Sequence, residues 1–447
     1  MSELGWLIER LESFGDEPAL AWNNRVVSYR QLVSEIRGWS AQLVKLGISP
    51  GACVAVRGDY SPTSCALLFA LALNKNVFVP LAPSAKQTAE FIEIAEVDVL
   101  LDLDGEKLGS VERFAPKSQH ALLQRLRASG APGLILFSSG TTGKSKASLI
   151  DFEKMLSKFK KSRAGMRTLT FLLLDHIGGI NTLLHALTAG GTVVPVAERT
   201  PAAICDAIQR HRIQLLPTTP TFLNILLMSD VHQNYDLSSL ELITYGTEPM
   251  PNSTLRHLHQ TFPNVRLKQT YGLSELGILQ TKSKEPDSLW VKVGGEGYET
   301  KIVDGILWIR TPSAMLGYLN APSPFDDEGW FNTNDAVEVD GEYLKILGRK
   351  SELINVGGEK VYPAEVEGII LQVSNVSDVM VAGRPSPITG QVVVARVALR
   401  EPEDANTLGR RVRQFCRERL APYKVPVSVE LVEGQLHGER FKKARAV

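Results

Sequence analysis

The segment from Leu134 to Lys146 has the residue types of a phosphate-binding loop. An apolar run is followed by Ser-Ser-Gly-Thr-Thr-Gly-Lys-Ser-Lys. Glycines let backbone N–H groups close around phosphate oxygens, hydroxyl groups donate to the same oxygens, and a lysine adds positive charge. The candidate phosphate-binding residues are Ser138, Ser139, Gly140, Thr141, Thr142, Gly143, Lys144 and Lys146. The segment therefore predicts that the chain binds a nucleotide.

The same segment differs from the P-loop of the usual ATPases and GTPases. The end of the G-x-x-x-x-G-K-[ST] pattern is present as Gly143-Lys144-Ser145, but the first glycine would fall on residue 138, which is a serine. A flexible surface loop is the alternative that this segment alone leaves open.

Four segments, in order along the chain, resemble motifs of the adenylate-forming superfamily. This superfamily contains acyl- and aryl-CoA ligases, firefly luciferase and the adenylation domains of nonribosomal peptide synthetases. The first segment is 138–146, and the second is Gln-Thr-Tyr-Gly-Leu-Ser-Glu at 269–275. The third is Gly-Trp-Phe-Asn-Thr-Asn-Asp at 329–335, and the fourth is 348–367, which begins Gly-Arg-Lys-Ser-Glu. The resemblance extends from about Tyr29 to Val429 and implies that the chain uses ATP and Mg²⁺ to activate a carboxylic acid.

The resemblance assigns a role to each motif residue. Lys146 and the loop hold the β- and γ-phosphates, and Glu275 holds Mg²⁺ together with Thr142. Tyr271 stacks on adenine, Ser274 reaches the α-phosphate, and Asp335 accepts from the ribose hydroxyls with Arg349 nearby. The remaining walls of the adenine and acid pockets are expected from Gly246, Thr247, Glu248 and Gly272.

His176 is the candidate residue between the acid pocket and the acceptor tunnel. It lies in Leu-Asp-His-Ile-Gly-Gly at 174–179, which resembles a segment of acyl- and aryl-CoA ligases. Amino-acid-activating relatives carry an aspartate at this position, so His176 argues against an amino-acid substrate. The neighbouring Asp175 keeps that alternative open.

Three positions depart from the family pattern. The hinge residue after Gly-Arg-x is Ser351, and Asn334 stands where the family has glycine. The C-terminal lysine that contacts the α-phosphate is replaced by Glu439. Either Lys442 or Lys443 replaces that lysine, or the first half-reaction is weak. The second half-reaction would instead use the loop at Gly358, which rotation of the C-terminal domain presents to the site.

Composition places the chain among two-domain α/β proteins. A chain of 447 residues is long for one core. We expect a fold of doubly wound α/β sheets with a small β-rich subdomain, followed by a small mobile α+β domain. Residue patterns predict helices from Tyr29 to Lys45 and from Leu408 to Leu420, and Asp-Gly pairs at 304–305 and 340–341 predict hairpins in the subdomain. The expected boundaries are 1–348 for the AMP- and acid-binding domain, 349–351 for the hinge and 352–447 for the C-terminal domain.

Charge and cysteine usage limit the partners and the compartment. The 49 basic and 49 acidic residues balance, which argues against nucleic acid as a partner. The four cysteines are far apart and suggest buried thiols in a reducing compartment. No signal peptide and no apolar run long enough to span a membrane are visible, so a cytoplasmic protein is expected.

The sequence thus predicts an acid–thiol ligase acting on an aryl or fatty acid, with a slight preference for aryl. The acceptor is CoA or the phosphopantetheine of a carrier protein. Two alternatives remain open: an adenylate-forming amide synthetase, and a pseudoenzyme that binds the adenylate but has lost turnover.

Overall fold

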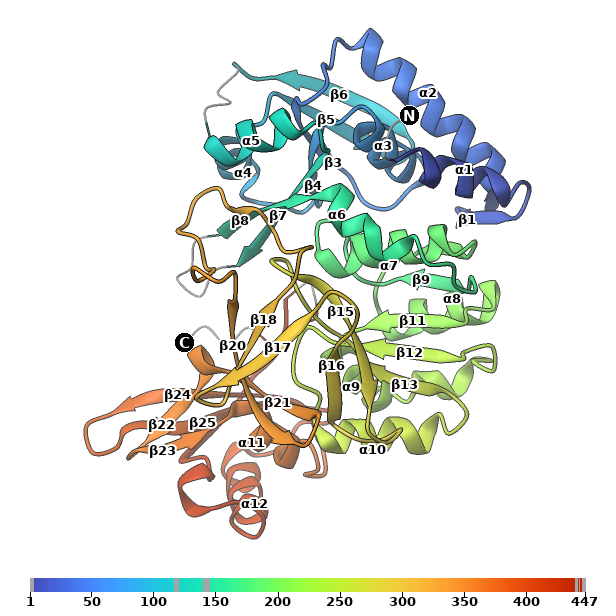
Figure 1. Ribbon diagram of the computed structural model, residues 1–447. Coiled ribbons are helices and arrows are strands. Elements are labelled where there is room, and N and C mark those ends of the chain that lie inside the picture. Colours follow the sequence, from blue (N-terminus) through green and yellow to red (C-terminus); the bar gives the residue numbers. More distant parts are fainter. Residues whose placement is uncertain (1–3, 116–119, 140–144, 439–440, 442, 444–447) are drawn as a thin grey trace.

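The computed structural model describes residues 4–115, 120–139, 145–438, 441 and 443. Over these residues the chain forms four β-sheets. Two α/β sheets with their helices make up the upper and right-hand parts of Figure 1, an antiparallel sheet lies between them and the C-terminal end, and a smaller α+β unit lies below.

The two α/β sheets are built from parallel strands joined by crossover helices, with antiparallel strands toward their edges. In spatial order the first sheet contains β13 (Arg266–Gln269), β12 (Leu242–Tyr245), β11 (Leu215–Thr218), β9 (Arg167–Thr170), β10 (Thr192–Pro195), β1 (Pro18–Trp22) and β2 (Arg25–Ser28). The second contains β19 (Gly317–Tyr318), β8 (Ser145–Asp151), β7 (Gly133–Ser139), β4 (Val77–Leu81), β3 (Cys53–Arg57), β5 (Val99–Asp104) and β6 (Lys107–Arg113).

Helices of the large domain pack on these sheets and between them. They are α1 (Gly5–Ser13), α2 (Tyr29–Lys45), α3 (Pro62–Leu73), α4 (Thr88–Ile94), α5 (Ala121–Ser129), α6 (Phe152–Leu156), α7 (Ile177–Thr188), α8 (Pro201–His211), α9 (Pro220–Met228) and α10 (Asn252–Thr261). The most central is α3, in which Pro62 to Ala72 are all buried. Its sequence is apolar on every face, as a helix covered on all sides must be.

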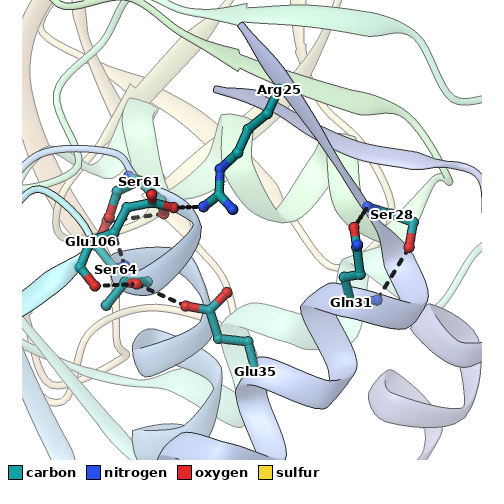
Figure 2. A network of polar contacts seen from close by, with 8 residues as sticks. Arg25, Ser28, Gln31, Glu35, Ser61, Ser64 and Glu106 are labelled. Carbon is teal, nitrogen blue, oxygen red and sulfur yellow. Dashed lines mark hydrogen bonds and ion pairs between the residues drawn. The ribbon is translucent and has the colours of Figure 1, made fainter. Parts of the chain in front are cut away.

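Polar contacts tie the N-terminal helices to the second sheet (Figure 2). A capping box at Ser28 and Gln31 begins α2. On the same helix, Glu35 accepts a hydrogen bond from Thr63 at the start of α3. The Glu106 side chain forms an ion pair with Arg25, and its backbone oxygen accepts from Thr63. These contacts join β2, α2, α3 and the β5–β6 turn into one unit.

The third sheet is antiparallel and was expected from two Asp-Gly turn signals. It contains β14 (Tyr271–Leu273), β15 (Gly277–Ser283), β16 (Trp290–Gly294), β21 (Tyr343–Arg349), β20 (Phe331–Asp340), β18 (Ile306–Arg310) and β17 (Glu299–Val303). The turns at 304–305 and 340–342 join β17 to β18 and β20 to β21. Asp304 and Gly305 have positive φ in the first turn, and Gly341 has positive φ in the second. Glycine adopts this conformation easily because it has no Cβ.

The C-terminal unit has its own sheet and its own apolar core. Its strands are β22 (Ile354–Val356), β23 (Glu359–Val361), β24 (Val376–Ser386), β25 (Gly390–Leu399) and β26 (Ser428–Leu431), with helices α11 (Pro363–Ile370) and α12 (Ala405–Arg417). The predicted fold class is therefore confirmed. Helix α12 begins three residues before the predicted Leu408, because Asp404 caps it by accepting from the Thr407 N–H.

Two predictions about side chains and segments can be compared with the described residues. All four cysteines are buried free thiols, as predicted. Within the described ranges, no helix has both the length and the apolar character needed to cross a membrane.

Candidate active site

The phosphate-loop segment connects two paired strands of the second sheet. Strands β7 and β8 form an antiparallel pair in which Ser138 lies opposite Lys146. Five predicted residues of the loop lie outside the described residues: Gly140, Thr141, Thr142, Gly143 and Lys144. Ser139 is described by its backbone alone. The described parts place both ends of the loop at the edge where β7 ends and β8 begins.

Glu275, Tyr318 and Lys146 meet beside that edge. The Tyr318 hydroxyl donates to Glu275 Oε1 at 2.5 Å, and the Lys146 ammonium lies 5.1 Å from the centre of the Tyr318 ring. Local pairing explains the meeting, because Tyr318 in β19 lies opposite Ser148 of β8, two residues from Lys146. The backbone oxygen of Glu275 also accepts from the Met315 N–H. The predicted Mg²⁺ ligand is thus oriented by a neutral hydroxyl.

Asp335, Tyr271 and Arg349 form a second cluster in the third sheet. Asp335 and Arg349 are directly opposite residues of β20 and β21, which brings Arg349 Nε to 3.4 Å from Asp335 Oδ1. The Tyr271 hydroxyl donates to Asp335 Oδ2 at 2.6 Å. Burial raises the pKa of the Asp335 carboxyl, and Arg349 and the Tyr271 hydroxyl oppose that rise. The predicted ribose contact and adenine contact therefore share one network.

Asn334, one of the three departures from the family pattern, has a conformational explanation. Its φ is 57°, in the left-handed region that glycine, asparagine and aspartate tolerate best. Asparagine therefore fills the glycine position without changing the backbone path to Asp335. The backbone N–H of Asp335 donates to Thr333 Oγ1, which fixes the turn from the other side.

Close contacts surround two glycines of the predicted adenine and acid pockets. A Cβ added to Gly246 would lie 2.5 Å from Thr270 Oγ1, and one added to Gly272 would lie 2.3 Å from Ile278 Cδ1. No larger side chain fits at either position without a shift of its neighbours. The neighbouring Thr247 has a φ of 74°. Glu248 accepts from the Thr221 N–H at 2.8 Å, which ties this loop to the start of α9.

His176 lies at the N-terminus of α7. Its Nδ1 accepts a hydrogen bond from the Gly178 N–H at 3.0 Å. A nitrogen that accepts carries no proton, so we assign the neutral tautomer with its proton on Nε2. The cleft beside it is lined by Ile177, by the motif residue Ser274, and by Leu276 and Lys158. The His176 segment and the second motif therefore border one cleft.

The donor set fits Mg²⁺ that is held mainly by substrate. Among the described residues no group of three or more His, Cys, Asp or Glu side chains gathers to hold a metal. Mg²⁺ is usually bound through one or two carboxylates plus substrate phosphates and water. Glu275, with one oxygen already oriented by Tyr318, suits that arrangement.

Lys443 lies apart from both clusters. Its ammonium is 3.3 Å from Glu367 Oε2 and 3.6 Å from Asp378 Oδ1, and it also donates to the Val379 backbone oxygen. Only 6% of the Lys443 side chain is exposed. Its predicted contact with the nucleotide would require leaving this ion pair. Lys442 and Glu439 lie outside the described residues.

The neighbouring Phe441 docks the C-terminal tail on the large domain. Its ring lies 5.2 Å from that of Phe171 and 5.4 Å from that of Phe222, and its backbone oxygen accepts from Thr219 Oγ1. Gly358, by contrast, lies in the exposed β22–β23 turn, where its N–H donates to Asn355 Oδ1. In this structure Phe441 contacts the large domain near α9, whereas the described hydrogen bond of Gly358 is to Asn355 of its own turn.

Sequence reasoning missed three polar residues of the site. Tyr318 orients Glu275, Thr333 orients the Asp335 backbone, and Asn181 accepts from the Lys158 ammonium at 2.7 Å. None lies in a motif quoted from the sequence except Thr333. Tyr318 follows Gly317, whose φ is 150°, and that glycine in the sequence did not indicate which residue Tyr318 would contact.

Comparison with known families identifies both parts of the chain. The family model described as "AMP-binding enzyme" matches residues 7–319. The model described as "AMP-binding enzyme C-terminal domain" matches residues 365–441.

Individual relatives cover nearly the whole chain. An indoleacetate–CoA ligase of Aromatoleum aromaticum is 32% identical over 93% of this chain and 91% of its own. A 2-succinylbenzoate–CoA ligase of Bacillus velezensis is 28% identical over 96% and 94%. Among solved structures, an anthranilate CoA ligase in complex with anthranoyl-AMP has a TM-score of 0.83 at 21% identity, covering 98% of this chain and 95% of that chain.

An amide bond synthetase from Marinactinospora thermotolerans also has the same fold. Its TM-score is 0.79 at 24% identity, with coverage of 99% of this chain and 98% of that chain. The fold alone therefore does not distinguish an enzyme that uses a thiol acceptor from one that uses an amine acceptor. The family models and the relative of 32% identity show that the chain belongs to the adenylate-forming, AMP-binding enzymes, the family of the AMP-forming acid–CoA ligases.

Proposed function

We propose that this chain joins a carboxylic acid, with aryl acids preferred, to AMP and then transfers the acyl group to the thiol of CoA. The observation that carries the proposal is the meeting of Glu275, Tyr318 and Lys146 at the end of the phosphate-loop hairpin. The preference for an aryl acid and for CoA is supported by the names of relatives, which include indoleacetate– and 2-succinylbenzoate–CoA ligases.

The first half-reaction replaces a poor leaving group by a good one. A carboxylate oxygen attacks the α-phosphorus of ATP, a P–O bond forms, and the bond to the β-phosphate oxygen breaks. Pyrophosphate leaves and acyl-AMP remains. The protein must hold the triphosphate and orient the carboxylate in line with the leaving oxygen.

The chain's own residues supply that orientation. Asp335, held by Tyr271 and Arg349, accepts from the ribose hydroxyls and so fixes the nucleoside. Lys146 adds positive charge beside the phosphates. Glu275 would hold Mg²⁺, whose charge offsets the charge of the polyphosphate. Because Tyr318 already binds one Glu275 oxygen, the Glu275 carboxylate would lose little orientational entropy when it binds Mg²⁺.

The second half-reaction transfers the acyl group. The sulfur of the acceptor thiolate attacks the acyl carbon, and the bond from that carbon to the AMP oxygen breaks. His176 precedes Ile177, which lines the cleft, and its Nδ1 accepts a hydrogen bond, so a neutral imidazole there would border the tunnel without repelling or trapping a thiolate. Rotation at residues 349–351 would present Gly358 for this step, and the domain limits 1–348 and 352–447 follow from that proposal.

A second candidate is a protein in which adenylation is slow. Its support is Glu439 in the sequence together with the pairing of Lys443 to Glu367 and Asp378. An anion beside a polyphosphate opposes the first half-reaction. Such a protein would transfer the acyl group from a preformed adenylate faster than it makes one.

Acid-dependent exchange of pyrophosphate into ATP tests the proposal. The panel contains benzoates, phenylacetates, cinnamates, fatty acids and amino acids. Exchange with aryl acids above the others is expected, and Glu439→Lys is expected to increase it. Exchange with amino acids alone would contradict the proposed substrate class, and Asp175 would then become the residue to examine.

The acceptor is tested separately. The purified acyl-AMP of an aryl acid is supplied with CoA, a holo carrier protein or an amine, and the acyl-transfer product is identified by its mass. CoA thioester is expected. Amide without thioester would favour the amide synthetase, and rapid transfer from aryl-AMP without exchange would favour the slow-adenylation candidate.

A further inference from the structure

Two hydrogen bonds join α9 and α10 of the large domain to the C-terminal unit. Asn224 of α9 donates to the Ser377 backbone oxygen at 3.0 Å, and Ser253 of α10 donates to the Gly368 backbone oxygen at 3.0 Å. A hydrogen bond of this kind adds little net stability, because water takes its place when the surfaces separate. These two bonds therefore permit the C-terminal unit to leave the large domain and to return.

Phe441 makes an apolar contact across the same boundary. Its ring lies 5.2 Å from that of Phe171 and 5.4 Å from that of Phe222, which it meets edge-on at 88°. Both of these rings are buried. Phe441 packs against the large-domain core that contains them, whereas the apolar residues described for the C-terminal sheet pack in a core of their own. Phe441 thus adds an aromatic ring of the C-terminal tail to a core of the large domain.

The tail is also tied to the C-terminal unit close to Phe441. Lys443 pairs with Glu367 and Asp378 of that unit, and it forms an antiparallel bridge with His437. The His437 ring stacks on the Phe441 ring, with 4.7 Å between the centres. Phe441 therefore lies in a short turn that is fixed to one unit while its ring contacts the other.

The backbone of Phe441 is strained in this position. Its φ is 49°, in the left-handed region that bulky residues rarely adopt. Its backbone oxygen accepts from Thr219 Oγ1 at 3.0 Å, so this contact and those of the ring offset the strain. Strained residues persist where their surroundings impose them, and they are common in segments that switch position. Separation from the large domain would relieve the strain while the ring contacts are lost.

The two rings that receive Phe441 belong to segments that border the candidate active site. Phe171 directly follows β9, and the segment 171–176 leads to His176, which caps α7. Phe222 lies in the first turn of α9, and Glu248 of the predicted adenine pocket accepts a backbone N–H of that turn. The position of the Phe441 ring is thus coupled to segments on both sides of the site.

We propose that the contact of the Phe441 ring with Phe171 and Phe222 holds the C-terminal unit in the position for adenylation, and that this contact must break before the acyl group is transferred. The inference rests on the proposed function and adds the residue that sets the balance between its two half-reactions. Phe441 is a positioning residue, because its ring contacts protein side chains. Breaking the contact frees the unit to rotate and bring the Gly358 turn to the acyl-AMP.

Separate measurement of the two half-reactions tests this role. Pyrophosphate exchange with aryl acids reports the first, and thioester formation from supplied acyl-AMP and CoA reports the second. Phe441→Ala is expected to lower exchange by about tenfold or more, the effect of losing two ring contacts, while the transfer rate stays equal or rises. Phe441→Leu keeps an apolar side chain and should have a smaller effect. The ratio of the two rates is the readout, because a loss of folded protein lowers both rates alike.

Phe415→Ala is the matched control. Phe415 is a partly buried phenylalanine of the same unit that packs against the C-terminal core, and the Arg419 guanidinium lies 3.6 Å from the centre of its ring. Its loss should leave the ratio of exchange to transfer unchanged. A wild-type ratio in Phe441→Ala would overturn the proposed role. An equal change of the ratio in Phe415→Ala would also overturn it, because general loosening of the unit would then be the cause.

Distances between two spin labels test the position of the unit without turnover. The four native cysteines are buried, so labels can be attached at Val44→Cys in α2 and Ile388→Cys in the β24–β25 turn, both exposed positions. With ATP and no acid, one main distance is expected when Phe441 is present, and a second population in Phe441→Ala. Identical distributions would overturn the proposed role, and exchange in both would leave the proposed function standing. Absence of exchange with every acid would instead overturn the proposed function, while the distances would still decide the role of Phe441.

Discussion

Glu275 and Lys158 in the large domain and Lys443 in the C-terminal core have different kinds of partner, whereas Asp335 has both kinds, the Tyr271 hydroxyl and the Arg349 guanidinium. In the active site, Glu275 is held by the Tyr318 hydroxyl, and Lys158 by an amide oxygen and a backbone oxygen. In the C-terminal core, Lys443 is held by two carboxylates. A neutral partner orients a charge without cancelling it, whereas an opposite charge cancels it. The difference predicts that loss of Glu275 affects mainly activity, whereas loss of Lys443 affects mainly stability.

Lys443 is expected to give the largest change in stability. In Lys443→Met, Glu367 and Asp378 lose their shared cation; only 2% of the Glu367 side chain is exposed. Removing one partner of a buried ion pair costs about 3–5 kcal/mol. Urea unfolding, with hydrogen exchange of the β24 and β25 amides, measures the loss. The control is Lys424→Met, which breaks a more exposed pair with Glu365 and should cost about 0–1 kcal/mol. Equal losses in the two variants would show that burial of the Lys443 ion pair does not matter for stability.

Glu275 is expected to give the largest change in activity. Glu275→Gln keeps the size of the side chain but removes its charge. Pyrophosphate exchange should fall by about a hundredfold or more, the order found when one group that stabilises transition-state charge is removed. The melting temperature should stay close to that of the wild type, since the described ion pairs do not include Glu275. The exposed Glu285→Gln is the control, and a comparable loss of exchange there would count against the assignment.

Tyr318→Phe is expected to have a smaller effect of the same kind. It deletes the hydroxyl that donates to Glu275 but keeps the ring beside Lys146. A hydrogen bond to a charged group is worth about 1.5–3 kcal/mol, so exchange should fall by at least about tenfold. The Mg²⁺ concentration for half-maximal exchange should rise. A fall without any change in Mg²⁺ dependence would show that Tyr318 acts through packing.

Much of the fold could be read from local signals in the sequence. The helix at Tyr29–Lys45 and the two Asp-Gly turns depend on residues close in sequence, and the structure has them where they were expected. The family motifs likewise marked Glu275 and Asp335, because each lies in a short stretch of characteristic residues. Local capping at Asp404 shifted the start of α12, which illustrates that helix ends depend on single side chains.

The contacts that orient the motif residues could not be read in the same way. Tyr318 meets Glu275 only because β19 pairs with β8, and Lys158 meets Asn181 only because the helical turn η1 (Ser157–Phe159) packs against α7. Both are tertiary contacts between residues far apart in sequence. Lys443, suggested by its position in the tail, sits in a buried ion pair that no local pattern marks.

Direct detection of acyl-AMP tests the central claim most directly. The chain is mixed with ATP, Mg²⁺ and phenylacetate in the absence of CoA, and the bound products are identified by mass. We predict the aryl-AMP with pyrophosphate in equal amount, and its absence in Glu275→Gln. ADP and phosphate as products, or no product from any acid of the panel despite binding of ATP, would contradict the assignment of this chain as an acid-activating ligase.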